Sequence, residues 1–191
     1  MKISNSKKKL NNKGFTLMEL IVVLAIMTIM VGAATATVSM LDSSYAQDAE
    51  RGIKDYIALG RAKSMSVAAK KWYVAISEED ETYYAYLYKV VEETVEEGGE
   101  IVVNTKEFLI EKKKLGAKVS IFYGKDDTKQ LLGSTNELRL YFNAATGKIE
   151  NVTVAGSDVG MDGGIGYITI QRNDYVINLK VFFNTGKCER E

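Results

Sequence analysis

The pattern of hydrophobic positions changes its period along the chain. Residues 15–38 are apolar apart from scattered small polar residues, and their one charged side chain is Glu19. Beyond them, apolar or small residues recur every three or four positions, which is the spacing of an amphipathic helix. These positions are Tyr45, Ala49, Ile53, Ile57, Gly60, Ser64 and Val67. The pattern predicts one helix from Phe15 to about Ala69, apolar in its first half and amphipathic over residues 39–70.

From residue 71 onward the period falls to two, the spacing of a half-buried strand. Trp72, Val74 and Ile76 alternate with residues of the opposite face, and a polar turn at 77–81 leads into a tyrosine-rich run at 83–90. These two runs predict a β-hairpin. Further strands are predicted at 119–123, 137–143, 148–154, 166–172 and 175–183.

Three other segments of the body predict irregular or helical structure. The acidic run 92–100 is typical of a solvated loop, and residues 157–164 are typical of a surface loop with two carboxylates. Thr105 is a candidate N-cap, Lys112–Lys114 would occupy a last helical turn and Gly116 would end it, so a short helix is predicted from residue 105.

The side chains of Tyr84, Tyr86 and Tyr88 are predicted to share one face of their strand. Such a stripe is compatible with a ligand platform, but aromatic residues are common in strands, so packing is the favoured interpretation.

Two late segments of the sequence repeat each other. Residues 138–143 lead to Thr146-Gly147-Lys148, and residues 179–184 lead to Thr185-Gly186-Lys187. Each glycine fits a turn position with positive φ, so the repeat predicts two similar strand-and-turn units. Neither is a phosphate-binding loop, because the required glycine spacing is missing and Ile149 stands where a hydroxyl is needed.

The predicted fold class is α+β, with a long N-terminal helix packed on an antiparallel β-sheet head at 71–191. Residues 1–14 hold five lysines and no acid, so the remainder carries 20 basic and 25 acidic side chains. This acidic body argues against a nucleic-acid partner, which normally requires a basic patch. With no histidine and one cysteine, Cys188, the sequence offers no ligand cluster for zinc or iron and lacks the commonest general base. A cation site in the acidic run 92–100 or at the carboxylates of 157–164 is the less favoured alternative to a surface loop.

The lysine-rich leader at 1–14 and the apolar run at 15–38 predict a membrane anchor. The run is long enough, at roughly 36 Å of helix, to cross a hydrocarbon core of about 30 Å. Lysines before such a run keep that end in the cytoplasm, which places the head outside it. The small-residue stretch at 33–36 is the other candidate cleavage site, and it would make the run an ordinary secretory signal.

The junction Lys13-Gly14-Phe15-Thr16-Leu17-Met18-Glu19-Leu20 resembles the class III signal peptide of type IV pilins and type II secretion pseudopilins. The resemblance implies that a prepilin peptidase cuts between Gly14 and Phe15 and then methylates the amine of Phe15. It also implies that Glu19 pairs with the Phe15 amine of a neighbouring subunit during assembly. The alternative for Glu19 is an interfacial carboxylate near the lipid headgroups. We expect Glu19→Ala to leave insertion and cleavage intact and to reduce incorporation into filaments.

Residues 59–68 and the paired Phe-Asn and Thr-Gly-Lys segments also resemble minor pseudopilins of the GspH/FimT type. The chain has no proline, whereas many pilins carry a helix-kinking proline in the apolar segment, and this difference favours a minor over a major subunit. The implied partners are the peptidase, other pilin subunits, an assembly ATPase, a platform protein and the membrane. The expected role is structural, without catalysis or cofactor. The alternatives are a signal-anchored binding domain, such as an adhesin or a DNA-uptake tip pilin, and a membrane-anchored enzyme.

Overall fold

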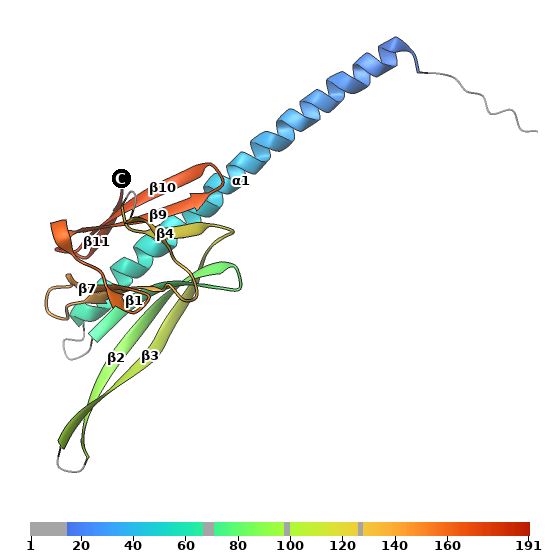
Figure 1. The fold of residues 1–191 in the computed structure, drawn as a ribbon. Coiled ribbons are helices and arrows are strands. Elements are labelled where there is room, and N and C mark those ends of the chain that lie inside the picture. The colour runs from blue at the N-terminus through green and yellow to red at the C-terminus, as the bar shows by residue number, and fades with distance from the viewer. Residues whose placement is uncertain (1–14, 67–70, 98–99, 126–127) are drawn as a thin grey trace, which may run out of the picture. The chain divides into compact units, whose positions relative to one another are not determined.

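The computed structural model describes residues 15–66, 71–97, 100–125 and 128–191. The chain divides into two compact units, Met1–Met40 and Leu41–Glu191. Helix α1 (Leu17–Ser66) passes through the boundary, so its first part belongs to the first unit and its remainder to the second (Figure 1). The predicted long helix is confirmed between these bounds, and its predicted end at residues 67–70 lies outside the described residues.

The second unit contains two antiparallel sheets. One has six strands in the order β3-β2-β1-β6-β7-β8, and the other has five in the order β11-β10-β9-β4-β5. The elements are β1 (Lys71–Glu79), β2 (Thr82–Glu97), β3 (Glu100–Ala117), β4 (Ser120–Tyr123), β5 (Gln130–Leu131), β6 (Leu138–Phe142), β7 (Ile149–Val154), β8 (Ser157–Asp158), the 3-10 helix η2 (Asp162–Gly164), β9 (Ile165–Arg172), β10 (Tyr175–Phe182) and β11 (Lys187–Arg190). The α+β class with an antiparallel head is therefore confirmed.

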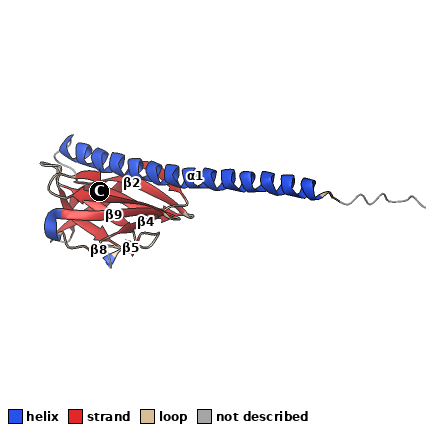
Figure 2. Cartoon of the chain, turned by 90° about the horizontal axis from the view of Figure 1, so that it is seen from above, coloured by secondary structure: helices blue, strands red, loops and turns tan. Residues whose placement is uncertain are grey.

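One hydrophobic core joins the second half of α1 to both sheets. The amphipathic repeat supplies Ala49, Ile53 and Ile57, all fully buried, and the inward face of β1 supplies Val74 and Ile76. Within this unit α1 lies along the sheets, as Figure 2 shows. Glycine at position 60 permits close packing, because a Cβ there would lie 2.7 Å from Val74 Cγ2 and 2.8 Å from Phe142 Cε2. The helical period read from the sequence thus marks the face that is buried.

A second, smaller cluster covers the opposite face of the six-stranded sheet. Its buried members are Tyr73, Ala75, Tyr86 and Val90, and Tyr84, Tyr88 and Tyr141 pack against them. The rings of Tyr73 and Tyr88 are stacked with their centroids 4.9 Å apart. The predicted tyrosine stripe is confirmed, and its rings pack against one another, as the favoured interpretation required.

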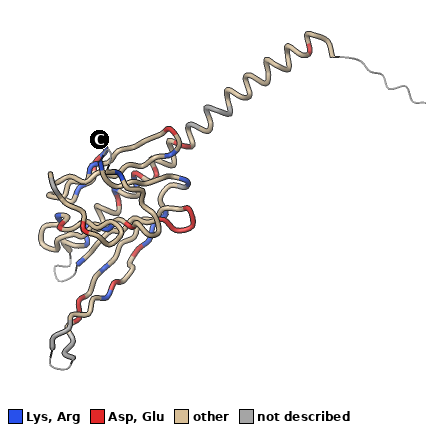
Figure 3. Tube along the Cα trace, viewed as in Figure 1, with Lys and Arg blue, Asp and Glu red and all other residues tan. Residues whose placement is uncertain are grey.

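The predicted loop at 92–100 is wrong for the residues that the structure describes. Strand β2 continues to Glu97 and β3 begins at Glu100, so residues 92–97 and Glu100 belong to the two strands of a long β-ribbon. The glutamates are compatible with a strand because lysines compensate them: Lys71 Nζ lies 2.7 Å from Glu92 Oε1, and Lys106 Nζ lies 2.6 Å from Glu93 Oε2. Figure 3 shows basic and acidic residues interspersed along this ribbon and the rest of the second unit.

The predicted short helix from residue 105 is also wrong, because this segment is the middle of β3. Its backbone pairs with β2, for example at Val90↔Glu107 and Tyr86↔Lys112. Capping and charge signals are local, whereas the cross-strand contacts with the tyrosines of β2 are not, and such tertiary contacts override weak helical preferences.

The strands predicted at 72–76, 83–90, 119–123, 137–143, 148–154, 166–172 and 175–183 are present as β1, β2, β4, β6, β7, β9 and β10. Residues 157–164, predicted to be a loop, contain the short strand β8 and the helix η2. The sequence did not indicate β5 and β8, which have two residues each and are too short to show an alternating pattern, nor β11, whose residues Lys187–Arg190 are mostly charged.

The two repeated segments lie beside each other in the structure. Gly147 and Gly186 both have positive φ, at 68° and 62°, as predicted. The amide of Ile149 donates a hydrogen bond of 2.9 Å to the carbonyl of Phe183 and so links β7 to the end of β10. The repeat therefore builds a junction between the two sheets.

Candidate processing and assembly site

The start of helix α1 is described from Phe15 onward. Phe15 and Thr16 lie outside the helix, which begins at Leu17. The side chain of Phe15 is 85% exposed. Gly14 and the leader, on which the predicted cleavage site depends, lie outside the described residues.

Thr16 and Glu19 cap this helix start reciprocally. The amide of Thr16 donates a hydrogen bond of 2.9 Å to Glu19 Oε2, and the Thr16 hydroxyl donates one of 3.0 Å to the same oxygen. The amide of Glu19 in turn donates to Thr16 Oγ1 at 3.3 Å. This is a capping box, in which the N-cap hydroxyl and the carboxylate three residues later satisfy amides that lack helical partners.

Thr16 is a functional candidate that the sequence interpretation missed. The signal was present, because a threonine followed three residues later by glutamate at the start of an apolar run is the pattern of a capping box. The interpretation treated Glu19 only as a charge within an apolar helix. In the structure, the Glu19 carboxylate also caps the helix of its own chain by accepting hydrogen bonds from Thr16.

Beyond the cap, the first unit exposes apolar side chains around the whole helix. Those at least two fifths exposed are Leu17, Met18, Leu20, Ile21, Val22, Val23, Leu24, Ile26, Met27, Ile29, Met30, Val31, Val38 and Met40. A helix that is apolar on all sides requires an apolar environment. Glu19 is the single charged residue of the described part of this unit.

Among the described residues, none of the helices combines the length and the apolar character that a membrane crossing requires. The membrane-spanning segment at 15–38 remains a prediction.

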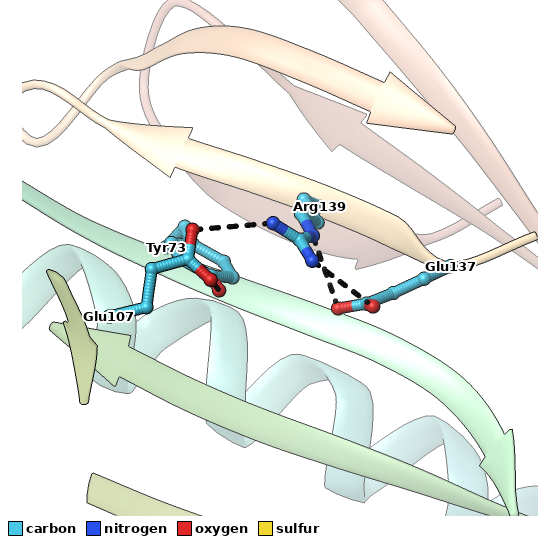
Figure 4. Close-up of polar contacts among 4 residues, drawn as sticks. All are labelled: Tyr73, Glu107, Glu137 and Arg139. Carbon is cyan, nitrogen blue, oxygen red and sulfur yellow. Dashed lines mark hydrogen bonds and ion pairs between the residues drawn. The ribbon is translucent and has the colours of Figure 1, made fainter. Parts of the chain in front are cut away.

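A polar cluster on the outer face of the six-stranded sheet is the other arrangement with chemical interest. Tyr73 donates a hydrogen bond of 2.7 Å to Glu107 Oε2, and Arg139 lies 3.3 Å from a carboxylate oxygen of both Glu107 and Glu137. Figure 4 shows Arg139 between the two carboxylates. Burial and the contact with Glu107 raise the pKa of Tyr73.

This cluster is best explained as a structural brace. The three strands β3, β1 and β6 contribute Glu107, Tyr73 and Arg139, and each carboxylate is already engaged by Arg139. Charge-assisted bonds of this kind tie β3 to β1 and β6 across the intervening strand β2.

Cys188 packs against the main core, and burial raises the pKa of its thiol to about 12. A thiol with such a pKa is largely unreactive at neutral pH. Within the part of the chain that the structure describes, no group of three or more Cys, Asp or Glu side chains is arranged to hold a metal ion.

Comparison with known protein families finds a match for the N-terminal segment. Residues 9–35 match the prokaryotic N-terminal methylation motif. This match identifies the segment as a class III signal and supports the resemblance to type IV pilin-like proteins. The matched range includes both the Gly14–Phe15 junction and the Thr16–Glu19 capping box. No curated protein and no solved structure matches the chain.

Proposed function

We propose that the chain is the precursor of a minor pilin or pseudopilin of the GspH/FimT type. A prepilin peptidase removes residues 1–14 by cutting between Gly14 and Phe15 and methylates the new amine. The observation that carries this proposal is the methylation motif at residues 9–35, whose predicted cleavage point lies two residues before the start of helix α1.

Residues 15–38 store the subunit in the cytoplasmic membrane, with the leader in the cytoplasm and the head at 71–191 outside it. The apolar side chains around the first part of α1 support this role, because lipid or neighbouring helices must cover them. An assembly ATPase and a platform protein then move the subunit into a type IV pilus or a type II secretion pseudopilus. The absence of proline from the chain supports a minor role.

Glu19 and the amine of Phe15 act in assembly. A carboxylate within an apolar helix costs about 2.5–3.5 kcal/mol at the centre of a bilayer, so pairing with a neighbouring subunit's Phe15 amine would favour transfer of both charges into a filament core. The role is structural rather than catalytic.

Mass spectrometry of the intact protein tests the processing step. In cells with an active prepilin peptidase, we expect the loss of residues 1–14 and the gain of one methyl group. Cells without the peptidase provide the control and should retain the full chain. An unprocessed N-terminus in cells whose peptidase is active would refute the proposal.

The assembly role is tested by changing the charge of Glu19 alone. Glu19→Ala removes the capping box together with the charge, whereas the amide of Glu19→Gln can still accept the capping hydrogen bonds. We expect the Gln variant to be cleaved and to be incorporated into filaments at least ten-fold less than the wild type. Equal incorporation would leave Glu19 as an ordinary capping residue.

A further inference from the structure

We propose that Thr16 is a positioning residue for removal of the leader. Its capping box with Glu19 begins helix α1 at Leu17 and keeps Phe15 and Thr16 out of the helix, next to the bond that is cut. The proposal rests on the proposed function, since it concerns the same cleavage junction.

The hydrogen bonds of the box compete directly with extension of the helix toward the leader. In a longer helix, the amide of Thr16 would donate to the carbonyl four residues earlier. Here that amide donates instead to Glu19 Oε2 at 2.9 Å, and the first helical bond is formed by the Leu20 amide and the Thr16 carbonyl at 3.2 Å. While the box is formed, the helix cannot extend through Thr16.

The sequence before the helix contains few other stop signals. The chain has no proline, so Gly14 is the single strong helix breaker near the junction. Lys13 adds an unfavourable charge at a helix N-terminus, but this effect is small and is screened by salt. The capping box is therefore the structural element that fixes where the helix begins.

The position of this helix start matters because a peptidase cuts accessible, non-helical backbone. A peptide bond inside a helix becomes accessible only after the helix has unfolded locally. Phe15, on the carboxyl side of the cut, is non-helical and 85% exposed in the structure. The box thus keeps Phe15, on the carboxyl side of the cut, in the non-helical form that a peptidase can bind. Loss of the box reduces the fraction of precursor in that form and raises the apparent dissociation constant in proportion. Glu19→Ala also removes the box, so on this proposal its cleavage is slowed too, in contrast to the expectation from the sequence alone that it is cleaved normally.

Substitutions at Thr16 separate the cap from other effects. Thr16→Ala removes the hydroxyl and introduces the strongest helix former, whereas Thr16→Ser keeps a hydroxyl that can cap. Thr28→Ala is a matched control, because the Thr28 hydroxyl also bonds within α1, to the carbonyl of Ala25 at 2.8 Å, but lies away from the junction.

The experiment measures initial cleavage rates of the full-length precursor by purified prepilin peptidase in the same detergent micelles, over a range of precursor concentrations. We expect Thr16→Ala to lower kcat/KM about five-fold through a higher KM, with kcat unchanged at saturation. Thr16→Ser and Thr28→Ala should remain within about two-fold of the wild type. A structural defect elsewhere in the chain would not produce this split between KM and kcat together with rescue by serine.

The experiment distinguishes failure of the proposed function from failure of the positioning role of Thr16. If the wild type is not cut between Gly14 and Phe15, the proposed function fails. If the wild type is cut and Thr16→Ala has the same kcat/KM, or if Thr16→Ser is as slow as Thr16→Ala, the positioning role is overturned and the proposed function stands.

Discussion

Asp42 and Arg172 lie far apart in the sequence, and in the structure Asp42 Oδ1 and Arg172 Nε are 2.5 Å apart. Asp42 is only 8% exposed, and its second oxygen accepts a hydrogen bond of 2.7 Å from the side-chain amide of Asn173. The Arg172 guanidinium also lies over the ring of Tyr45, 4.3 Å from its centroid. The contact ties the beginning of the second unit to the turn between β9 and β10.

This contact predicts a specific dependence of stability on pH. Hydrogen bonds from Arg172 and Asn173 hold the pKa of Asp42 below its ordinary value. The unfolded chain therefore binds more protons than the folded chain between the two pKa values. The stabilisation is fully present above the unfolded pKa of about 3.9 and is lost as the pH falls through the folded pKa.

The measurement is thermal unfolding of the full-length protein and of Asp42→Asn in detergent, from neutral to acidic pH. We expect the variant to melt several degrees lower at neutral pH, and the difference to shrink below about pH 4. Asp48→Asn is the control, because its partner Arg51 lies 3.6 Å away and both side chains are more than half exposed. A constant difference between wild type and Asp42→Asn at all pH values would contradict the assignment.

The close approach of α1 to the sheet at Gly60 gives a second prediction. Alanine at this position should favour the helix by about 1 kcal/mol. The added Cβ, however, would overlap Val74 and Phe142, which are buried and have little room to move. Overpacking of this kind costs about 1–3 kcal/mol, so we expect Gly60→Ala to lower the free energy of unfolding by about 1 kcal/mol in urea titrations.

The matched control is Gly32→Ala in the same helix, where an added Cβ meets nothing within 4 Å in the single chain. This change should leave the unfolding of the second unit unaltered. If Gly60→Ala instead stabilised the protein, helix propensity would dominate and the packing at this position would be looser than the structure indicates.

The elements that the sequence predicted are those with a sustained period. Helix α1 could be predicted because its core positions recur every three or four residues, and β1, β9 and β10 because their residues alternate. The second half of β2, from Glu92, and the whole of β3 could not be predicted in the same way. Their glutamates and lysines look like loop and helix signals until Lys71 and Lys106 are seen beside Glu92 and Glu93.

The candidate site was predictable only in part. The cleavage at Gly14–Phe15 and the assembly role of Glu19 stay predictions from sequence motifs, whereas the Thr16–Glu19 box is present in the structure and was recognisable from its spacing. The contact between Asp42 and Arg172 had no sequence signal, because it depends on how the sheets fold back onto α1. Local motifs can therefore be recognised in the sequence, whereas contacts between distant segments can be identified only from the fold.

The outer polar cluster predicts that the hydroxyl of Tyr73 stabilises the sheet. Tyr73→Phe keeps the stacked ring and removes the hydrogen bond to Glu107, while Glu107 retains Arg139. A hydrogen bond from a buried donor to a charged group contributes about 1.5–3 kcal/mol, and we expect a loss near the lower end of this range. The measurement is the free energy of unfolding in urea.

Tyr84→Phe is the control for that change. The Tyr84 ring lies under Lys112, 4.0 Å from Nζ to the centroid, and phenylalanine preserves this contact. Its effect should therefore remain within about 0.5 kcal/mol. Equal effects at the two positions would mean that the ring of Tyr73, rather than its hydroxyl, supports the sheet.

The junction between the two repeated turns gives the last prediction. Gly186 has a φ of 62°, and an added Cβ would press on the carbonyl oxygen of Gly147 in the neighbouring turn. Left-handed backbone costs about 1–2 kcal/mol for an L-residue, and the collision adds to this.

Gly156 is the control for this change. It has a φ of 77° with nothing within 4 Å of an added Cβ, so alanine there has the backbone cost alone. We expect urea unfolding to show a larger loss for Gly186→Ala than for Gly156→Ala, by about 1–3 kcal/mol. Equal losses would show that the two turns can separate without cost, and the repeat would then not be what joins the sheets.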